Sequence, residues 1–596
     1  MGTGFTIDTA LRVAKYGIDS ALSLLDDVLI EQMREYHSEQ AGEPFTPIAA
    51  TEDDRRARRI TAYLNLLGRL VDRQVEQLRA QRFQPGSEIV RYFELLPEGP
   101  LKQRYNHMQV TADPERRRRL QEELRGEIVA GSIDVNIMTA ADGDTYYAGS
   151  RLPAEQTVAM SALRGFAQSE LESAVVFSAG MHQRLYAYCA QFPDFLPDYA
   201  GRLRKRIILK VSDFRSALIQ GRFLARQGLW VSEFRVESGI NCGGHAFSGK
   251  GHLLGFVLSE FRLRREELRS TLHKAMCSAL TELGRPVPDV PYEMRVTAQG
   301  GIGTAGEQRE LMRDYELDGT GWGTPFLLVP EVTNVDEEHV RRLCAATDRD
   351  VFLSDSSPLG VPFWNLRSSA SETARRRRIA AGRPGSACPK GYGRINTELT
   401  ETPICTASRA YQRLKLEQLE GQGLTRRQLA HRREAVLAKS CICHDLAGCA
   451  TVKCGIEPEA APAMCCGPAI TSFTRVASLD EMVGHIYGRR SILGRRRRNH
   501  MFTRELLLNI AVLRRNVLKL TRGIWAGKPA SLQQIKENLV EQIAYYRHLL
   551  ADSVDKNKHR YLRDLNLAGR ALRAIPLAGA IKAWTRRQRT LSGRGG

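Results

Sequence analysis

Short apolar runs rich in β-branched residues alternate with helical patterns along roughly the first 330 residues. This alternation is typical of repeated β-α-β units, which build a parallel sheet covered by helices. Eight such runs are candidate strands, and they cover residues 5–13, 17–24, 133–138, 174–177, 206–211, 231–236, 294–298 and 319–328. Their number favours an α/β fold of the closed (β/α)8 TIM-barrel type, and a doubly wound sheet is the alternative.

Two stretches interrupt or end this alternation and divide the chain into predicted regions. Residues 38–127 indicate a helical insertion, so the barrel is expected from residues 1–37 and 128–367. Residues 368–500 contain many loops and cysteines, and residues 501–596 combine helical apolar spacing with basic charge. A chain of 596 residues is long enough for more than one such unit.

Glycine-rich segments follow neighbouring predicted strands. The first is Glu237-Ser-Gly-Ile-Asn-Cys-Gly-Gly-His245, the second is Val296-Thr-Ala-Gln-Gly-Gly-Ile-Gly303, and Gly321-Trp-Gly-Thr324 follows in the next run. Ligands of α/β folds bind at the carboxyl ends of strands, where glycines let backbone amides approach a phosphate. The alternative is a set of tight turns without a ligand. The predicted phosphate-binding residues are Gly300, Gly301, Gly303, Gly323 and Thr324.

His245 directly follows Gly243 and Gly244 after a predicted strand. A histidine titrates near neutral pH and can therefore take or give a proton at physiological pH. A histidine taken alone is more often structural. The position of His245, one strand before the predicted phosphate site, favours a catalytic role as general acid or base.

The order strand-Gly-Gly-His, strand-Gly-Gly-Ile, strand-Gly-Thr resembles the nitronate monooxygenase (2-nitropropane dioxygenase) family of FMN-dependent TIM barrels. It is also similar to the related flavin enoyl reductases of fatty-acid and polyunsaturated-fatty-acid synthesis. Ile207-Ile-Leu-Lys-Val-Ser212 and Asp134-Val-Asn136 resemble further strands of these enzymes. The resemblance implies that the glycine turns hold the FMN phosphate and that His245 faces the substrate. It adds three cofactor-binding candidates, which are Asn136, Lys210 and Gln299.

The resemblance implies a flavin-dependent oxidoreductase and leaves two reactions open. In a nitronate monooxygenase-like reaction, His245 removes a proton from the carbon next to a nitro group, and reduced flavin reacts with oxygen. In an enoyl reductase-like reaction, NAD(P)H reduces FMN, which delivers hydride to an activated alkene. Cys242 stands where alanine or serine is expected, and a methionine motif is absent from residues 5–13. The substrate therefore stays open.

Positive charge is concentrated near the C-terminus. Residues 481–596 hold 25 Lys and Arg against 7 Asp and Glu, and so carry +18 of the net charge of +20. Such a region attracts acidic or anionic partners, and with a reductase it suits an acyl substrate on an acidic acyl carrier protein. The alternative is a non-catalytic barrel scaffold whose basic tail binds RNA, an acidic protein or an anionic membrane. No nucleic-acid motif accompanies the arginine runs, which disfavours nucleic acid.

The sequence shows neither a membrane-spanning apolar run nor a signal-peptide pattern, which predicts a cytoplasmic protein with reduced thiols. Of its twelve cysteines, six lie between Cys441 and Cys466. These six, together with Cys388 and Cys405, could bind zinc or an iron–sulfur cluster. Their spacing matches no paired Cys-x-x-Cys pattern, so buried free thiols are the favoured interpretation.

Overall fold

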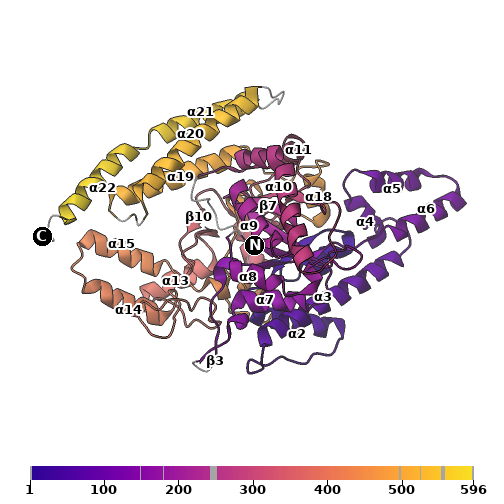
Figure 1. Ribbon diagram of the computed structural model, residues 1–596, viewed down its shortest axis with the longest axis horizontal. Coiled ribbons are helices and arrows are strands. Elements are labelled where there is room, and N and C mark those ends of the chain that lie inside the picture. The colour runs from indigo at the N-terminus through magenta and orange to yellow at the C-terminus, as the bar shows by residue number, and fades with distance from the viewer. Residues whose placement is uncertain are drawn as a thin grey trace.

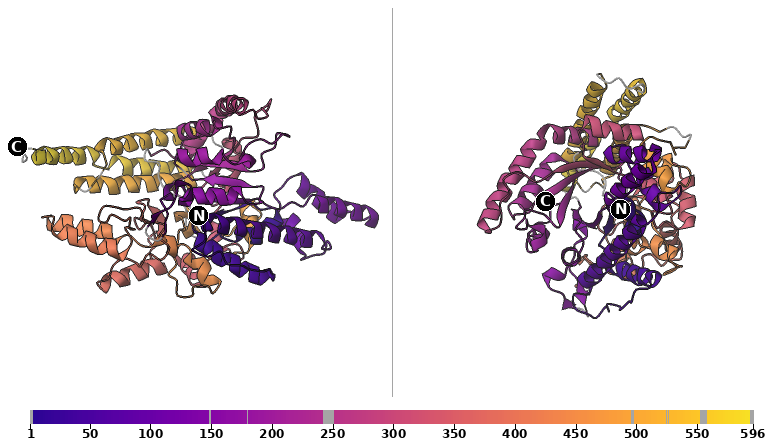
Figure 2. Two further views of the ribbon diagram at one scale, coloured as in Figure 1. Left: turned by 60° about the horizontal axis from the view of Figure 1, so that its bottom comes forward. Right: turned by 90° about the vertical axis from the view of Figure 1, so that its right-hand side faces the viewer.

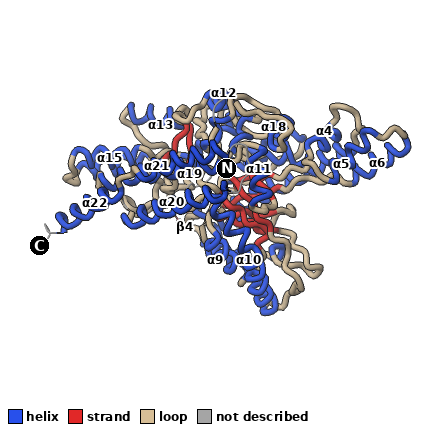
Figure 3. The backbone as a smooth tube through the Cα atoms, turned by 90° about the horizontal axis from the view of Figure 1, so that it is seen from above, coloured by secondary structure: helices blue, strands red, loops and turns tan. Residues whose placement is uncertain are grey.

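A seven-stranded parallel sheet lies at the centre of the molecule, and helices surround it and extend from it (Figure 1). The computed structural model describes residues 3–147, 150–178, 180–241, 251–494, 498–523, 525, 527–551 and 558–592. Cys242 and His245, which the sequence singled out, lie outside these ranges. Figure 3 shows the strands gathered in one part of a largely helical chain.

The strands of the central sheet run parallel in the order β1-β2-β5-β6-β7-β8-β9. Their bounds are β1 Ser20–Ser23, β2 Ile133–Ile137, β5 Ala174–Phe177, β6 Arg206–Val211, β7 Val231–Glu237, β8 Arg295–Gln299 and β9 Gly319–Gly321. The sheet is curled like half of a barrel. Within the described part of the chain no pairing joins β9 to β1, and a full TIM barrel is not confirmed.

Seven of the eight predicted runs contain a strand of this sheet. The last strand is short because Thr324–Leu328 turns into a 3-10 helix after β9. The prediction for residues 5–13 was wrong, because this segment ends in helix α1, Thr9–Val13. Asp8 and Arg12 pair across one helical turn, with 2.9 Å between Oδ2 and Nη2. This contact uses the i, i+4 spacing of a helix, which the apolar alternation of the segment did not reveal.

The two faces of the sheet differ in chemistry. Residues of one face, such as Val175, Leu209 and Phe234, belong to the main apolar core, which also holds Phe214 of α9 (Phe214–Ala225) and Phe261 of α10 (Leu254–Glu282). The alternate residues form the opposite face, which the curl makes concave. That face is largely polar and carries Asp134, Asn136, Lys210, Glu233, Arg235, Glu237, Thr297 and Gln299.

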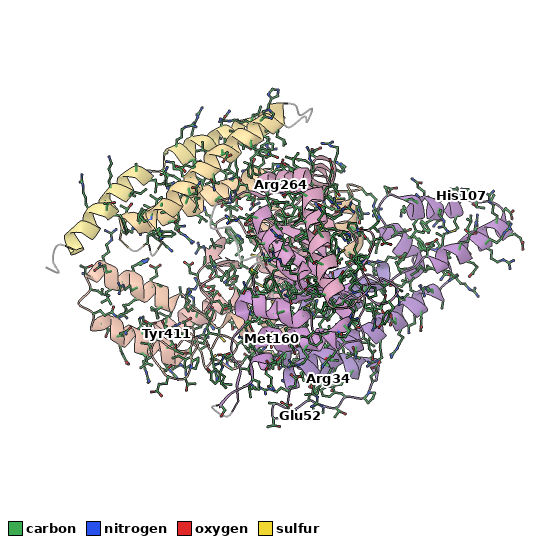
Figure 4. All side chains as sticks on the ribbon, in the orientation of Figure 1. Arg34, Glu52, His107, Met160, Arg264 and Tyr411 are labelled. Carbon is green, nitrogen blue, oxygen red and sulfur yellow. The ribbon has the colours of Figure 1, made fainter. Side chains whose placement is uncertain are left out.

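Helix α10 bends at Arg264. Arg264 has non-helical backbone angles (φ −117°, ψ 16°) within α10. Its guanidinium lies 4.2 Å from the ring centroid of Phe214 on α9, and Figure 4 labels this side chain at the top of the body. The bend lets both halves of a 29-residue helix follow the outer surface of the sheet.

Helices fill the predicted insertion, although its domain boundaries stay a prediction. The buried apolar face of α3 includes Ile60, Leu64 and Leu67, and it packs on α7 so closely that a Cβ atom on Gly165 would lie 2.8 Å from Cβ of Ile60. Figure 1 shows α5 and α6 extending from the body. The helices within residues 38–127 are α3 Arg55–Arg79, α4 Glu88–Leu95, α5 Pro100–Val110 and α6 Pro114–Gly126, and they lie between α2 Asp27–Ala41 and α7 Val158–Ala167 in the chain.

The segment after the sheet alternates short helices with long loops. A small antiparallel pair, β10 (Val351–Ser354) with β11 (Phe363–Leu366), lies among them. The helices here and between the strands are α8 Gln183–Cys189, α11 Ala305–Asp314, α12 Glu337–Ala345, α13 Ala370–Ala380, α14 Arg409–Glu420, α15 Arg426–Leu437, α16 Ile442–Asp445, α17 Gly448–Lys453 and α18 Leu479–Ile486.

Four helices complete the chain and form a long arm (Figure 2). They are α19 Met501–Thr521, α20 Pro529–Ala551, α21 Lys558–Arg573 and α22 Leu577–Ser592. α19 packs against the other three, with Leu506, Leu513 and Leu520 buried at helical spacing. None of the described helices combines the length and apolar character needed to cross a bilayer.

Candidate functional site at the carboxyl ends of the strands

Glu237, at the carboxyl end of β7, joins predicted site residues from the two neighbouring strands. Its Oε1 lies 2.9 Å from Nζ of Lys210 on β6. The same oxygen accepts hydrogen bonds from Nε2 of Gln299 on β8 and, at 2.8 Å, from Nδ2 of Asn241. Burial acts to raise the pKa of Glu237, but Lys210 and Gln299 hold this pKa below its ordinary value. The carboxylate is therefore ionised at neutral pH and fixes both side chains.

A second ion pair lies two residues earlier on the same strand. Nε of Arg235 donates to Oε1 of Glu233 at 2.7 Å, and the hydroxyl of Thr297 on β8 donates to the same oxygen at 2.6 Å. These groups satisfy one another on the concave face, as buried charges require. The polar concave face thus ends, at the carboxyl edge of the sheet, in the network around Glu237.

Gly300 and Gly301 form the turn that follows β8, and both have positive φ, of 104° and 80°. A Cβ atom on Gly300 would lie 3.0 Å from Cα of Asn241, and one on Gly301 would lie 2.3 Å from Cδ1 of Ile240. The backbone angles and the lack of space both require glycine here. The backbone of this turn was predicted to approach a phosphate closely. It instead packs, in part, against Ile240 and Asn241 of the loop after β7.

Three side chains hold Gly303, the last glycine of this turn. Its N–H donates to Oε2 of Glu307 at 2.9 Å, and its carbonyl accepts from Nε2 of His485 at 3.0 Å. A Cβ atom on Gly303 would lie 2.7 Å from Nη2 of Arg498. Arg498 also donates to the carbonyl of Gly301 at 2.9 Å. The amide that was predicted to face a phosphate thus faces a protein carboxylate.

Glu307 lies in the first turn of α11, where a helix favours negative charge. Its Oε1 accepts from Nη1 of Arg498 at 2.5 Å and from the amide of Met501 at 2.7 Å. Burial acts to raise the pKa of Glu307, but Arg498 and His500 bring this pKa below its ordinary value. An internal anion therefore occupies donors that a phosphate at this helix end would use.

Gly323 and Thr324 follow β9, next to the turn after β8. The strands place Gln299 beside Gly321, whose Cβ atom, if present, would lie 3.0 Å from Cβ of Gln299. Thr324 is buried at the start of the 3-10 helix. In the described part of the chain, neither the amide of Gly323 nor that of Thr324 donates to an acceptor. Among the described residues, this half of the predicted phosphate site therefore has backbone donors without an acceptor.

The remaining predicted site residues are placed differently. Asn136 lies on the concave face of β2, two strands away from Lys210, and no described contact joins the two side chains. The structure thus brings Lys210 and Gln299 together with the glycine turns, but it does not bring Asn136 to them. His245 lies outside the described residues, and its role stays a prediction.

A buried carboxylate from the C-terminal region, Glu505 on α19, binds both ends of the loop after β7. Its Oε1 accepts from the hydroxyl of Ser238 at 2.7 Å and from the amide of Gly239 at 3.3 Å. Its Oε2 accepts from the amide of Leu254, the first residue of α10, at 2.9 Å. Burial raises the pKa of Glu505 to about 7, and the hydrogen bonds from Ser238, Leu254 and Gly239 offset this rise only in part.

Helix α20 supports the same loop. Nε2 of Gln542 donates to the carbonyl of Gly251 at 2.8 Å, and its Oε1 accepts from the amide of Leu253. Gly255 packs against the rings of Tyr546 and Tyr315, since a Cβ atom there would lie 2.8 Å and 2.9 Å from their atoms. The C-terminal helices therefore contact described residues on both sides of residues 242–250, which include His245.

Sequence reasoning missed the residues that complete this site. Glu307 stands four residues after Gly303, so a capping position in the first turn of α11 was a usable signal. Arg498 and Glu505 had none, because each lies some 200 or more residues from its partner in the chain. In the sequence, Arg498 is distinguished only as the last residue of the run Arg495–Arg498.

Known proteins show little similarity to this chain. No family model matches this chain, and no curated protein matches it. Among solved structures, the chain is similar to the enoyl reductase domain of MlnA from the macrolactin biosynthesis cluster of Bacillus amyloliquefaciens. The two share 14% identity over 64% of this chain and 86% of that one, with a TM-score of 0.33. A likeness of this degree carries no argument about fold or activity.

Proposed function

We propose that this chain is an FMN-dependent oxidoreductase whose cofactor binds at the carboxyl ends of β6 to β9. The observation that carries the proposal is the arrangement of Lys210, Gln299 and the Gly300–Gly301 turn at one edge of a parallel sheet, beside Gly323 and Thr324. This is the edge at which parallel α/β folds bind phosphorylated ligands. The sequence resemblance to flavin enzymes supplies the identity of the cofactor.

The residues at the proposed phosphate site fit such a group in part. The amides of Gly323 and Thr324 and the buried hydroxyl of Thr324 are suitable donors. Gly303 does not fit, because its amide is bound to Glu307 and Arg498 covers it. We therefore assign the phosphate of FMN to Gly323 and Thr324, with Gly300 and Gly301 shaping the facing turn.

The side chains of the site have separate roles in this proposal. Lys210, held by Glu237, presents a fixed positive charge on the concave face, and Gln299 is oriented by the same carboxylate. His245 would exchange a proton with the substrate as general acid or base. Glu505 and Gln542 hold both ends of its loop at described residues. FMN, when bound, supplies the two-electron redox chemistry.

Between the two reactions, we propose the enoyl reductase type with NAD(P)H as electron donor. The observation that favours it is the basic C-terminal arm, which would attract an acyl substrate carried on an acidic carrier protein. The nitronate monooxygenase type is the second candidate within the same fold. The non-catalytic scaffold, in which the same arm binds an acidic protein, RNA or an anionic membrane, is the candidate from another class.

The absorption spectrum of the purified chain tests the cofactor. A flavin band, or binding of added FMN, is expected, and a colourless protein that does not bind FMN would favour the scaffold. Anaerobic mixing with NAD(P)H then separates the two reactions, because rapid bleaching of the flavin band is expected only of the reductase. His245→Ala should retain the flavin and lose turnover, and unchanged turnover would remove His245 from its proposed role.

A further inference from the structure

Four cysteines from two loop segments converge in the part of the chain that follows the sheet. Cys388 and Cys405 lie on one loop, which is closed by backbone bridges between Ser386 and Ser408 and between Asn396 and Ile404. Cys441 and Cys443 flank the first residue of α16.

Residues 356–358 accept hydrogen bonds from both segments. The hydroxyl of Thr406, next to Cys405, donates to the carbonyl of Pro358 at 3.3 Å. The amide of Ser440, next to Cys441, donates to the carbonyl of Ser356 at 3.0 Å. Because both cysteines adjoin residues anchored to positions 356–358, their side chains are held in the same small region.

The sulfur atoms form two close pairs with ordered surroundings. Sγ of Cys441 lies 3.9 Å from Sγ of Cys443. Cys388 and Cys405 contact each other in a small buried cluster with Ala407, separate from the main core. The amide of Ala407 donates to Sγ of Cys405 at 3.4 Å. Backbone N–H groups that donate to cysteine sulfur stabilise the thiolate form, which is the form that binds metals.

The two pairs also lie close to each other. The charge of Cys388 acts on Cys441, and the charge of Cys441 acts on Cys405, across the two pairs.

The surrounding loop has little regular secondary structure, and Lys390 and Tyr392 connect it to Asp26. Between α13 and α14, residues 381–408 contain no helix and only isolated bridges. Loops of this length without secondary structure are uncommon in compact domains, and a bound metal is one way to stabilise them. Gly393 packs on Cys405, since a Cβ atom there would lie 3.0 Å from Sγ of Cys405.

We propose that Cys388, Cys405, Cys441 and Cys443 bind an iron–sulfur cluster of the [2Fe–2S] type, one pair on each iron. Across the described residues, no three His, Cys, Asp or Glu side chains are gathered as a single metal ion would require. A binuclear cluster needs only two protein ligands per iron, since bridging sulfides complete each coordination sphere. The two-by-two arrangement therefore favours this cluster over a mononuclear zinc site. The proposal does not depend on the flavin function.

Metal and sulfide analysis of the full-length chain, purified without oxygen, tests the proposal. We expect about two iron and two acid-labile sulfide per chain, and an EPR signal after reduction by dithionite. Cys405→Ser and Cys441→Ser should each lose most of the iron. The half-buried Cys344 on α12 offers a matched control, and the Cys344→Ser variant should retain the iron.

Three results would overturn the cluster. They are a chain that binds no metal, a chain with one zinc and no sulfide, and iron that persists in both cysteine variants. Circular dichroism of each variant shows whether it folds. If the buried variants do not fold, Cys443→Ser replaces them, because this side chain is half-buried; retention of full iron in that folded variant would also contradict the assignment.

Discussion

The carboxylate of Glu505 accepts a hydrogen bond from the hydroxyl of Ser238, with 2.7 Å between Oε1 and Oγ, across 267 residues of chain. This contact joins the N-terminal part of α19 to the loop that leaves β7. The same carboxylate binds the amide at the start of α10. The C-terminal helices are thus part of the structure at the carboxyl edge of the sheet, and not only a basic appendage.

We expect Glu505→Gln to change how stability depends on pH. The folded-state pKa of about 7 lies above the ordinary value of 4.5, so Glu505 contributes stability fully below about pH 4.5. That contribution is lost as pH rises through 7, because burial disfavours the ionised form. Glutamine stays neutral at every pH. Between pH 5 and pH 9, the free energy of unfolding of the variant should therefore rise relative to that of wild type by roughly 3 kcal/mol.

Urea unfolding of both proteins across that pH range measures this difference. Glu266→Gln on the exposed side of α10 removes a carboxylate without burial and serves as the control. A Glu505→Gln curve parallel to that of wild type would show that Glu505 titrates normally. The protection factors of the Gly239 and Leu254 amides, corrected for the intrinsic pH dependence of exchange, should rise at low pH in wild type and stay constant in the variant.

Replacing Glu307 by Gln should lower the free energy of unfolding, because it removes the ion pair with Arg498. The change leaves the buried guanidinium without its counter-ion, and breaking such a pair costs about 3–5 kcal/mol. Because the folded pKa of Glu307 is lowered, its contribution is present above the ordinary carboxyl pKa and is lost as pH falls through the folded value. The variant should therefore lose less stability in acid than wild type does.

A double-mutant cycle checks this coupling. The free energy of unfolding is compared for Glu307→Gln, Arg498→Met and the double variant. We expect the double variant to be more stable than the sum of the single effects predicts, because it leaves no unpaired charge. Strict additivity would mean that the 2.5 Å contact contributes nothing.

Lys210→Met should weaken FMN binding about tenfold or more, if the proposed cofactor site is correct. A hydrogen bond to a charged group contributes about 1.5–3 kcal/mol, and the change also leaves Glu237 ionised without its cation. The pKa of Glu237 should rise as a result. Fluorescence titration with FMN gives the Kd. Arg206→Gln removes a charge from the exposed start of the same strand and should leave the Kd unchanged.

The strands were accessible from the sequence because their signals are local. The runs at 174–177 and 206–211 match β5 and β6 in full, since buried parallel strands need continuous apolar, β-branched residues. Residues 5–13 were mistaken for a strand because Phe5 and Ile7 alternate with polar residues. The buried pair of Asp8 with Arg12 outweighs that pattern and supports a helix.

The site was predictable only where backbone conformation dictates the residue. The positive φ of Gly300 and Gly301 explains why glycines occur at the end of β8, so the turn was found. The side chains that pack against this turn could not be predicted, because Ile240 and Arg498 contact it only in the folded structure. A glycine-rich turn alone therefore did not distinguish a phosphate from the side chains of Glu307 and Arg498.

Gly301→Ala tests whether the turn after β8 is packed as tightly as the structure shows. Alanine disfavours a φ of 80°, and its methyl group would lie 2.3 Å from Cδ1 of Ile240. We expect a loss of about 1–3 kcal/mol in the free energy of unfolding. Gly306 lies five residues away on α11, where a Cβ atom would meet nothing closer than 3.7 Å. Gly306→Ala should be neutral or stabilising, since alanine is the better helix former. Equal stability of the two variants, measured by urea unfolding, would contradict the contact between Gly301 and Ile240, whereas recovery in Gly301→Ala with Ile240→Val would locate the clash.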